Sequence, residues 1–376
     1  MSATTILRPI LTRKALVPIA LGWAAFGALT LAAPALHGPL STPVLFLVLA
    51  AIVAVIIVCA SGVVAQAERL SHRLGDPYGT LVLTLSIVVI EVILISAVML
   101  GPGEHTTIAR DSVMAVAMII LNLVIGVALV VGGLRHAGMR PNKAGVSSYL
   151  ALLVVLLTTA FALPGLIGEQ GAYTAGQAVP IALMTVALYV VFLVRQTGAQ
   201  SADFREVAAS PSHVATTSIG EVFAEHRAEI LARTLVLVVT VVPIVLLSHD
   251  MATLLDDGLD RLGAPVALSG ILIALIVFLP ETITTIRAAA AGEIQRVSNL
   301  CHGALVSTVG LTIPAVLVIG LLTGQTVLLA PTAVDLVLLA VTLLLTVISF
   351  FGSRATVLHG AAHLMLFALY GLTVFA

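Results

Sequence analysis

Residues 80–95 read TLVLTLSIVVIEVILI and residues 272–286 read LIALIVFLPETITTI. Each stretch is almost wholly apolar and carries one acidic residue, Glu91 in the first and Glu281 in the second. Apolar runs of about 20 residues are typical of transmembrane helices. A charged side chain at the centre of such a helix costs about 2.5–3.5 kcal/mol on insertion scales, so it is rarely kept without a function. The two stretches therefore predict carboxylates held inside a bilayer.

The composition of the whole chain agrees with a lipid environment. Of its 376 residues, 60% are hydrophobic and 9% are charged, whereas soluble domains carry roughly 25% charged residues. The net charge of −1 argues against a nucleic-acid partner. Cys59 and Cys301 fall in or beside apolar segments, so they do not indicate a disulfide framework or a metal pair. The first apolar stretch lacks a clear cleavage site, and we interpret it as a transmembrane helix rather than a signal peptide.

The apolar segments predict an all-α polytopic membrane protein with about 11 transmembrane helices. They lack the period-two alternation of a membrane β-barrel, so the helical interpretation is favoured. The predicted spans are 15–36, 43–64, 79–100, 112–134, 147–168, 177–195, 232–249, 264–286, 301–323, 329–350 and 355–375.

The loops between these spans are charged asymmetrically. Fifteen of the 17 Lys and Arg residues fall in the N-terminal tail and in every second loop, and only Arg110 and Arg261 fall on the other side. Positive residues concentrate on the cytoplasmic side of membrane proteins. We therefore expect a multi-pass protein of the inner (plasma) membrane with a cytoplasmic N-terminus and an outside C-terminus.

A polar stretch divides the chain into two sets of helices. We predict an N-terminal tail and first helix in 1–42, a five-helix repeat in 43–195, a mobile cytoplasmic linker in 196–231 and a second five-helix repeat in 232–376. Because five is odd, the two repeats begin on opposite faces of the membrane, which is the plan of an inverted-topology repeat.

The two glutamates occupy the second helix of each repeat, and we expect them to meet near the membrane midplane. There they would bind a cation and protons in turn. Pro280 removes a backbone donor next to Glu281 and should break the helix. His302 is a candidate proton relay, and the hydroxyl and amide side chains are candidates either for ion contact or for helix packing. The supporting residues are Thr84, Ser86, Asn122, Pro280, Thr282, His302, Ser307 and Thr308.

The stretches GDPYGTLVLTLSIVVIEVILI (75–95) and FLPETITTIRAAAAGEIQRVSNLCHGALVSTVGLTIPAV (278–316) resemble the calcium/cation antiporter superfamily. The resemblance is to the bacterial ChaA-type calcium (sodium)/proton antiporters in particular. It implies that Glu91 and Glu281 form the central cation site and exchange the cation for protons. Many members have a hydroxyl or Asn three or four residues before each glutamate, where this chain has Ile87, Val88, Val277 and Phe278.

The resemblance leaves the transported cation open. Ca²⁺ is favoured because two protons replace it without a change of charge, and Na⁺ or K⁺ is the alternative at the same site. No cofactor is expected, and the partners would be the transported cations, protons and the lipid bilayer. A remote alternative is a Mg²⁺-dependent intramembrane prenyltransferase, since Asp256, Asp257 and Asp260 have D-D-x-x-D spacing in a predicted outside loop. We favour a transporter over an enzyme because that motif occurs once.

Overall fold

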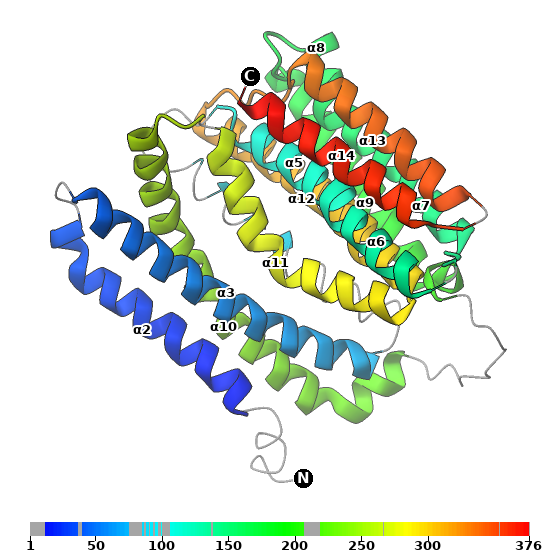
Figure 1. Cartoon of the computed structure of the whole chain (residues 1–376), viewed down its shortest axis with the longest axis horizontal. Coiled ribbons are helices and arrows are strands. Elements are labelled where there is room, and N and C mark those ends of the chain that lie inside the picture. The colour runs from blue at the N-terminus through cyan, green and yellow to red at the C-terminus, as the bar shows by residue number, and fades with distance from the viewer. Residues whose placement is uncertain are drawn as a thin grey trace. The chain divides into compact units, whose positions relative to one another are not determined.

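The chain folds almost entirely into helices (Figure 1). The computed structural model describes residues 12–36, 40–74, 85, 88–89, 91–92, 95–96, 99, 106–136, 138–206, 219–265, 267–352 and 354–375. Within these residues there is no β-strand, and the only extended pairings are isolated bridges such as Met139 with Ala355.

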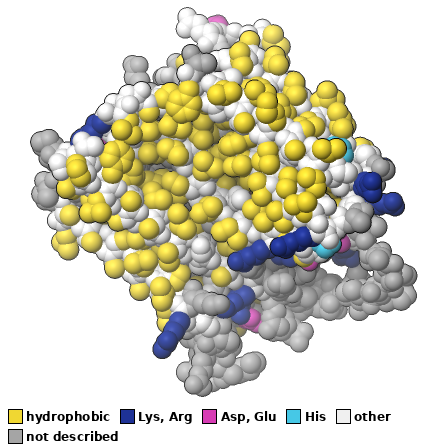
Figure 2. Space-filling view, viewed as in Figure 1, with side chains coloured by type: hydrophobic (Ala, Val, Ile, Leu, Met, Phe, Trp, Pro, Cys, Tyr) yellow, Lys and Arg dark blue, Asp and Glu magenta, His cyan; other side chains and the backbone are white. Residues whose placement is uncertain are grey.

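Nine of the described helices are long and apolar enough to cross a membrane, and a tenth span consists of two segments joined at a bend. The predicted span 79–100 lies mostly outside the described residues. Figure 2 shows the matching surface, where apolar side chains cover most of the visible face and Lys and Arg lie towards its margins. The prediction of an all-α polytopic membrane protein is confirmed.

The helices form two compact units that are not the two sequential halves of the chain. The first unit comprises residues 1–86 and 210–269, and the second comprises 87–209 and 270–376. The predicted repeat boundaries and the inverted relation between the repeats stay predictions.

Three helices build the first unit: α2 (Arg13–Leu36), α3 (Thr42–Leu74) and α10 (Ile219–Leu262). They approach closely at small residues, because a Cβ added at Gly62 would lie 2.6 Å from the ring of Pro18. The thiol of Cys59 donates to the carbonyl of Pro18 over 3.2 Å. Small residues at contacts are how helices associate in lipid, where the hydrophobic effect does not drive them together.

Helix α10 corrects the expected position of three acidic residues. Asp256, Asp257 and Asp260 lie in its last turns and not in a loop. The helix continues there because Leu255 and Leu259 are buried one turn apart and Asp257 pairs with Arg261 at 2.8 Å.

The linker 196–231 was predicted to be mobile. Helix α10 begins at Ile219, inside that stretch. At its other end, a short 3₁₀ helix η3 (Ser201–Phe204) packs into the second unit, where Phe204 is 2% exposed and its carbonyl accepts a hydrogen bond of 2.6 Å from Asn299. Residues 201–204 and 219–231 therefore have regular helical structure, and the mobility of the linker stays a prediction.

The second unit contains all the remaining helices. Two of its spans contain π-helical turns, which are wider than α-helix and often mark functional sites. The elements are α5 (Ile108–Met118), η1 (Ile119–Val124), α6 (Ile125–Arg135), α7 (Lys143–Leu157), η2 (Thr158–Ala162), α8 (Leu163–Ile167), α9 (Ala175–Thr197), α11 (Ala267–Ala291, from Gly270 onward), α12 (Ile294–Thr323), α13 (Ala333–Phe351) and α14 (Val357–Val374).

Helix α12 and the span α5–η1–α6 form the interior of this unit. In an apolar 18-residue stretch of each, 67% and 83% of the residues, respectively, are buried. The outer helices expose large apolar side chains such as Leu183 on α9, Leu344 on α13 and Leu372 on α14. This distribution places the core around α12 and presents the outer faces to lipid.

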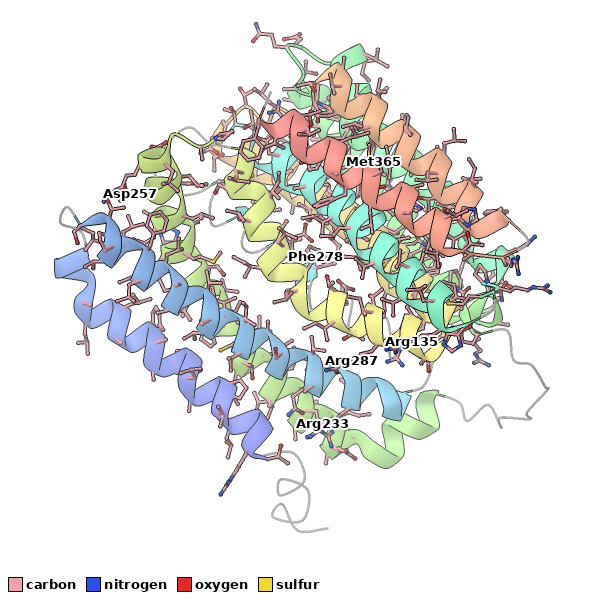
Figure 3. The ribbon with its side chains drawn as sticks, in the orientation of Figure 1. Arg135, Arg233, Asp257, Phe278, Arg287 and Met365 are labelled. Atoms are coloured by element: carbon pink, nitrogen blue, oxygen red, sulfur yellow. The ribbon has the colours of Figure 1, made fainter. Side chains whose placement is uncertain are left out.

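Basic residues gather at one end of the second unit, where several loops meet (Figure 3). At one end His136 contacts the carbonyl of Ala290 at 3.0 Å, and the side chain of Arg354 lies against Gly138. Arg135 and Arg287 also flank this end (Figure 3). At the other end, the backbone of Leu328 donates to Thr106. Loops that were assigned to one side of the membrane therefore do meet at one end of this unit.

Candidate functional site

Glu91 belongs to a helical segment with one buried face. Val88 and Ile95 are 0% and 1% exposed, Glu91 is 4% exposed, and Val89 is 43% exposed. Residues 88, 91 and 95 are three and four positions apart, so they share one helix face. The carboxylate therefore points into the second unit and not into lipid.

Glu281 lies at a bend in α11. The segments Leu268–Ile276 and Glu281–Ala291 meet at 59°. Pro280 cannot donate a backbone hydrogen bond, and the hydroxyl of Thr282 donates to the carbonyl of Phe278 over 2.8 Å. Figure 3 marks Phe278 on this stretch of α11. The predicted break next to the carboxylate is confirmed, and Glu281 is 4% exposed.

Helix α12 brings the two carboxylates into one region. The hydroxyl of Thr308 donates to Oε2 of Glu91 over 2.6 Å. Two turns earlier on the same face of α12, the thiol of Cys301 lies 4.0 Å from the hydroxyl of Thr285. Thr285 is one turn from Glu281 on α11, so α12 contacts Glu91 through Thr308 and the turn that carries Glu281 through Cys301.

The remaining carboxylate oxygens have no hydrogen-bond partner among the described residues. They are Oε1 of Glu91 and both oxygens of Glu281, and all three are buried. Burying an ionised carboxylate is far more costly than burying a neutral group, so such a pair must be neutralised by protons or by a cation. Hard cations prefer oxygen ligands of this kind. The arrangement can bind cation and protons in competition.

The other predicted residues divide into groups. Thr308 contacts a glutamate, whereas Thr282 uses its hydroxyl on its own helix. Ser307 accepts a hydrogen bond of 3.1 Å from the hydroxyl of Tyr189. Thr84 and Ser86 lie outside the described residues, and of Pro280 only the backbone is described.

His302 is fully buried and has no hydrogen bond to either glutamate. Its Nδ1 lies 2.8 Å from the hydroxyl of Ser298, and Nε2 has no partner among the described residues. Its ring packs against Phe350 with centroids 4.9 Å apart. A relay through His302 stays a prediction.

Asn122 forms no hydrogen bond to either glutamate. Its amide nitrogen donates to Thr342 over 2.8 Å, and its carbonyl oxygen lies 3.2 Å from Nδ1 of His363. Sequence reasoning missed His363, although a histidine inside the apolar segment 355–375 was a signal that deserved the same weight as the glutamates.

The sequence of the chain matches a known protein family. The profile of the sodium/calcium exchanger protein family matches residues 44–198 and 233–376. The chain belongs to this family. The match spans both units and includes Glu91, Glu281 and Thr308.

Two curated members of similar length resemble the chain closely. The sodium-potassium/proton antiporter ChaA of Escherichia coli (strain K12) is 35% identical over 84% of this chain and 86% of its own length. The putative ionic transporter y4hA of Sinorhizobium fredii (strain NBRC 101917 / NGR234) is 36% identical over 82% of this chain and 83% of its own length.

Solved exchanger structures share the fold. The Ca²⁺/H⁺ antiporter protein YfkE has a TM-score of 0.69 and 20% identity, and the match covers 97% of this chain and 99% of YfkE. The H⁺/Ca²⁺ exchanger CAX has a TM-score of 0.68 and 13% identity, with 96% of this chain and 89% of CAX covered. At these identities the likeness shows that the exchanger-family fold is common to all three chains.

Proposed function

We propose that this chain is a secondary active cation/proton antiporter. The observation that carries the proposal is the pair of buried glutamates in the second unit, whose four carboxylate oxygens include three with no partner among the described residues. Membership of the exchanger family and the proton antiporter named among its relatives support the same conclusion.

The fluxes of cation and protons are coupled because an empty, charged site has a high free energy in lipid. With both carboxylates ionised and unpaired, movement of the site across the bilayer is opposed by desolvation. Protons on one side or a cation on the other remove that penalty. The site therefore crosses only when occupied, and rocking of helical elements exposes it to each face in turn.

Ca²⁺ is our first candidate for the cation. Two carboxylates balance one divalent ion, and two returning protons restore neutrality. The hard oxygens of Glu91, Glu281 and Thr308 suit Ca²⁺, which takes six to eight oxygen ligands, with backbone carbonyls and water completing the shell.

Na⁺ or K⁺ is the second candidate, and two observations favour it. The relative from Escherichia coli is named for sodium, potassium and protons. In addition, Val88 and Phe278, which precede the glutamates by three residues, are buried apolar side chains. The site therefore supplies few ligands of its own to a high-coordination ion.

The proposal also covers the location and orientation of the protein in the membrane, and its lack of a cofactor and of an enzymatic reaction. We propose a location in the inner membrane with the N-terminus in the cytoplasm, and transport without a resident cofactor and without catalysis. The helical position of Asp256, Asp257 and Asp260 removes the loop on which the prenyltransferase alternative depended. Reporters fused after Ala376 and near Ala209 should appear outside and inside, respectively, and the same side for both would contradict this topology.

The decisive experiment measures cation-driven proton flux in proteoliposomes, with Ca²⁺, Na⁺ and K⁺ added separately. Wild type should release protons with at least one cation. Glu91→Gln and Glu281→Gln keep the side-chain shape and remove the titrating group, so each should abolish coupled flux in a folded protein.

Glu293→Gln is the matched control, because Glu293 lies at the start of α12, is 40% exposed and pairs with Arg296 at 3.0 Å. It should transport like wild type. Full flux in either core mutant, or no flux in wild type with any of the three cations, would show that the proposal is wrong.

A further inference from the structure

A second buried polar cluster lies in the second unit apart from the glutamates. It comprises Asn122 on η1, Thr342 and Ser349 on α13, and His363 on α14, and each is at most 1% exposed. None of its hydrogen bonds reaches Glu91 or Glu281. Buried polar groups at membrane depth are retained for packing or function, and this cluster joins three separate spans.

The hydrogen bonds fix the direction of each group. The amide nitrogen of Asn122 donates to Thr342 over 2.8 Å, so its oxygen is the atom that faces His363. An amide oxygen only accepts. Nδ1 of His363 therefore carries the hydrogen, and Nε2 lies 3.1 Å from the hydroxyl of Ser349, which can donate to it. Because an unpaired charge is costly to bury, the neutral form with its hydrogen on Nδ1 fits this cluster.

Asn122 lies in the middle of the π-helical turn Ile119–Val124. π-helical turns are rare and occur frequently at functional sites. His363 and Thr342 bind the two ends of the same amide, and α14 is held against α6 where Gly360 meets Gly126. The cluster thus clamps the π turn from two neighbouring helices.

The π turn packs on the helix that serves the cation site. Helix α12 contacts both α5 and η1, and α12 supplies Thr308 to Glu91. A change at Asn122 is therefore transmitted to the carboxylates through one packed helix, without direct contact with the ion.

We propose that His363 is a positioning residue for exchange. As the neutral Nδ1–H tautomer it holds Asn122, and with it the π turn against α12, in the geometry that the glutamate site requires. The inference rests on the proposed antiport activity, and it assigns His363 no proton-carrying role.

Two substitutions separate the two ring nitrogens. His363→Asn places an amide donor near the position of Nδ1, so it keeps the bond to Asn122. His363→Gln places its amide near Nε2, so it keeps Ser349 and loses Asn122. We expect His363→Asn to retain at least half of the wild-type flux with an unchanged pH profile, and His363→Gln to raise the half-saturating cation concentration tenfold or more.

Two further variants keep the test independent of folding. Thr342→Val is isosteric and removes the acceptor of the Asn122 amide, so it should reproduce His363→Gln. His359→Asn is the matched control, because His359 is one turn earlier on α14 and its hydrogen bonds within the described residues are to the helix-capping Thr356. It should behave like wild type.

The proposal is overturned if His363→Asn is as impaired as His363→Gln, if its pH profile shifts, or if Thr342→Val transports normally. Nitrogen-15 NMR of labelled histidine reads the tautomer whether or not the protein transports. A hydrogen on Nδ1 and a bare Nε2 would support the proposal, and any other state would overturn it. If the wild-type protein shows no cation-driven proton flux but His363 has the expected tautomer, the result would count against the antiport function alone.

Discussion

The contact between α6 and α14 offers a sharp test of how the second unit is packed. A Cβ added at Gly360 would lie 2.6 Å from the backbone oxygen of Gly126 and 2.9 Å from the backbone nitrogen of Val130. Backbone atoms of an interior helix cannot turn aside as a side chain can. Gly360→Ala must therefore push the two helices apart by about 0.8 Å to reach an ordinary contact of about 3.4 Å.

Gly371 provides the control on the same helix, because nothing lies within 4 Å of a Cβ added there. Both substitutions gain the same helix propensity of about 0.5–1 kcal/mol, so that contribution cancels in a comparison of the two. Overpacking a close contact costs about 1–3 kcal/mol. We expect Gly360→Ala to be less stable than Gly371→Ala by about that amount.

The same displacement should weaken transport. His363 is three residues along α14 from Gly360 and bonds Asn122 at 3.2 Å, a distance that leaves little room before the hydrogen bond is lost. The assays are thermal unfolding in detergent and cation-driven proton flux. Equal melting temperatures for the two alanine variants, with equal flux, would refute the close packing of α6 on α14.

Three further predictions concern other parts of the chain. Thr308→Val keeps the side-chain shape but removes the hydroxyl that orients Glu91. Hydrogen bonds to charged groups contribute about 1.5–3 kcal/mol, so the flux should fall roughly tenfold or more. Thr308→Ser keeps the hydroxyl and should retain the flux. Phe204→Ala should lower the free energy of unfolding by about 3–5 kcal/mol, since the ring is 2% exposed and packs on Tyr149 at 5.1 Å; a melting temperature like that of wild type would contradict the packing of η3. Asp257→Asn should change stability by less than about 1 kcal/mol and leave flux intact, because its pair with Arg261 is partly exposed; loss of flux would restore a functional role to the acidic residues of α10.

The sequence alone determined the membrane-spanning character and most of the span positions, and it singled out the two glutamates as candidates for the cation site. These features are local, because about 20 consecutive residues decide whether a segment enters lipid. The high cost of a charge in that environment singles out Glu91 and Glu281 without knowledge of their neighbours. The bend at Glu281 was also predictable, since the missing donor of Pro280 acts within one turn.

The tertiary structure decided which side chains meet. Thr308 and Glu91 are 217 residues apart, and His363 and Asn122 are 241 apart. Their contacts depend on how each helix is rotated and crossed against its neighbours, which apolar periodicity does not specify when nearly every face of a helix is apolar. For this reason the sequence left open whether Asn122 serves ion contact or helix packing, and the structure shows its hydrogen bonds to Thr342 and His363. Packing also decided that the acidic end of α10 is helical, because Leu255 and Leu259 are buried among neighbouring helices that the local sequence does not reveal.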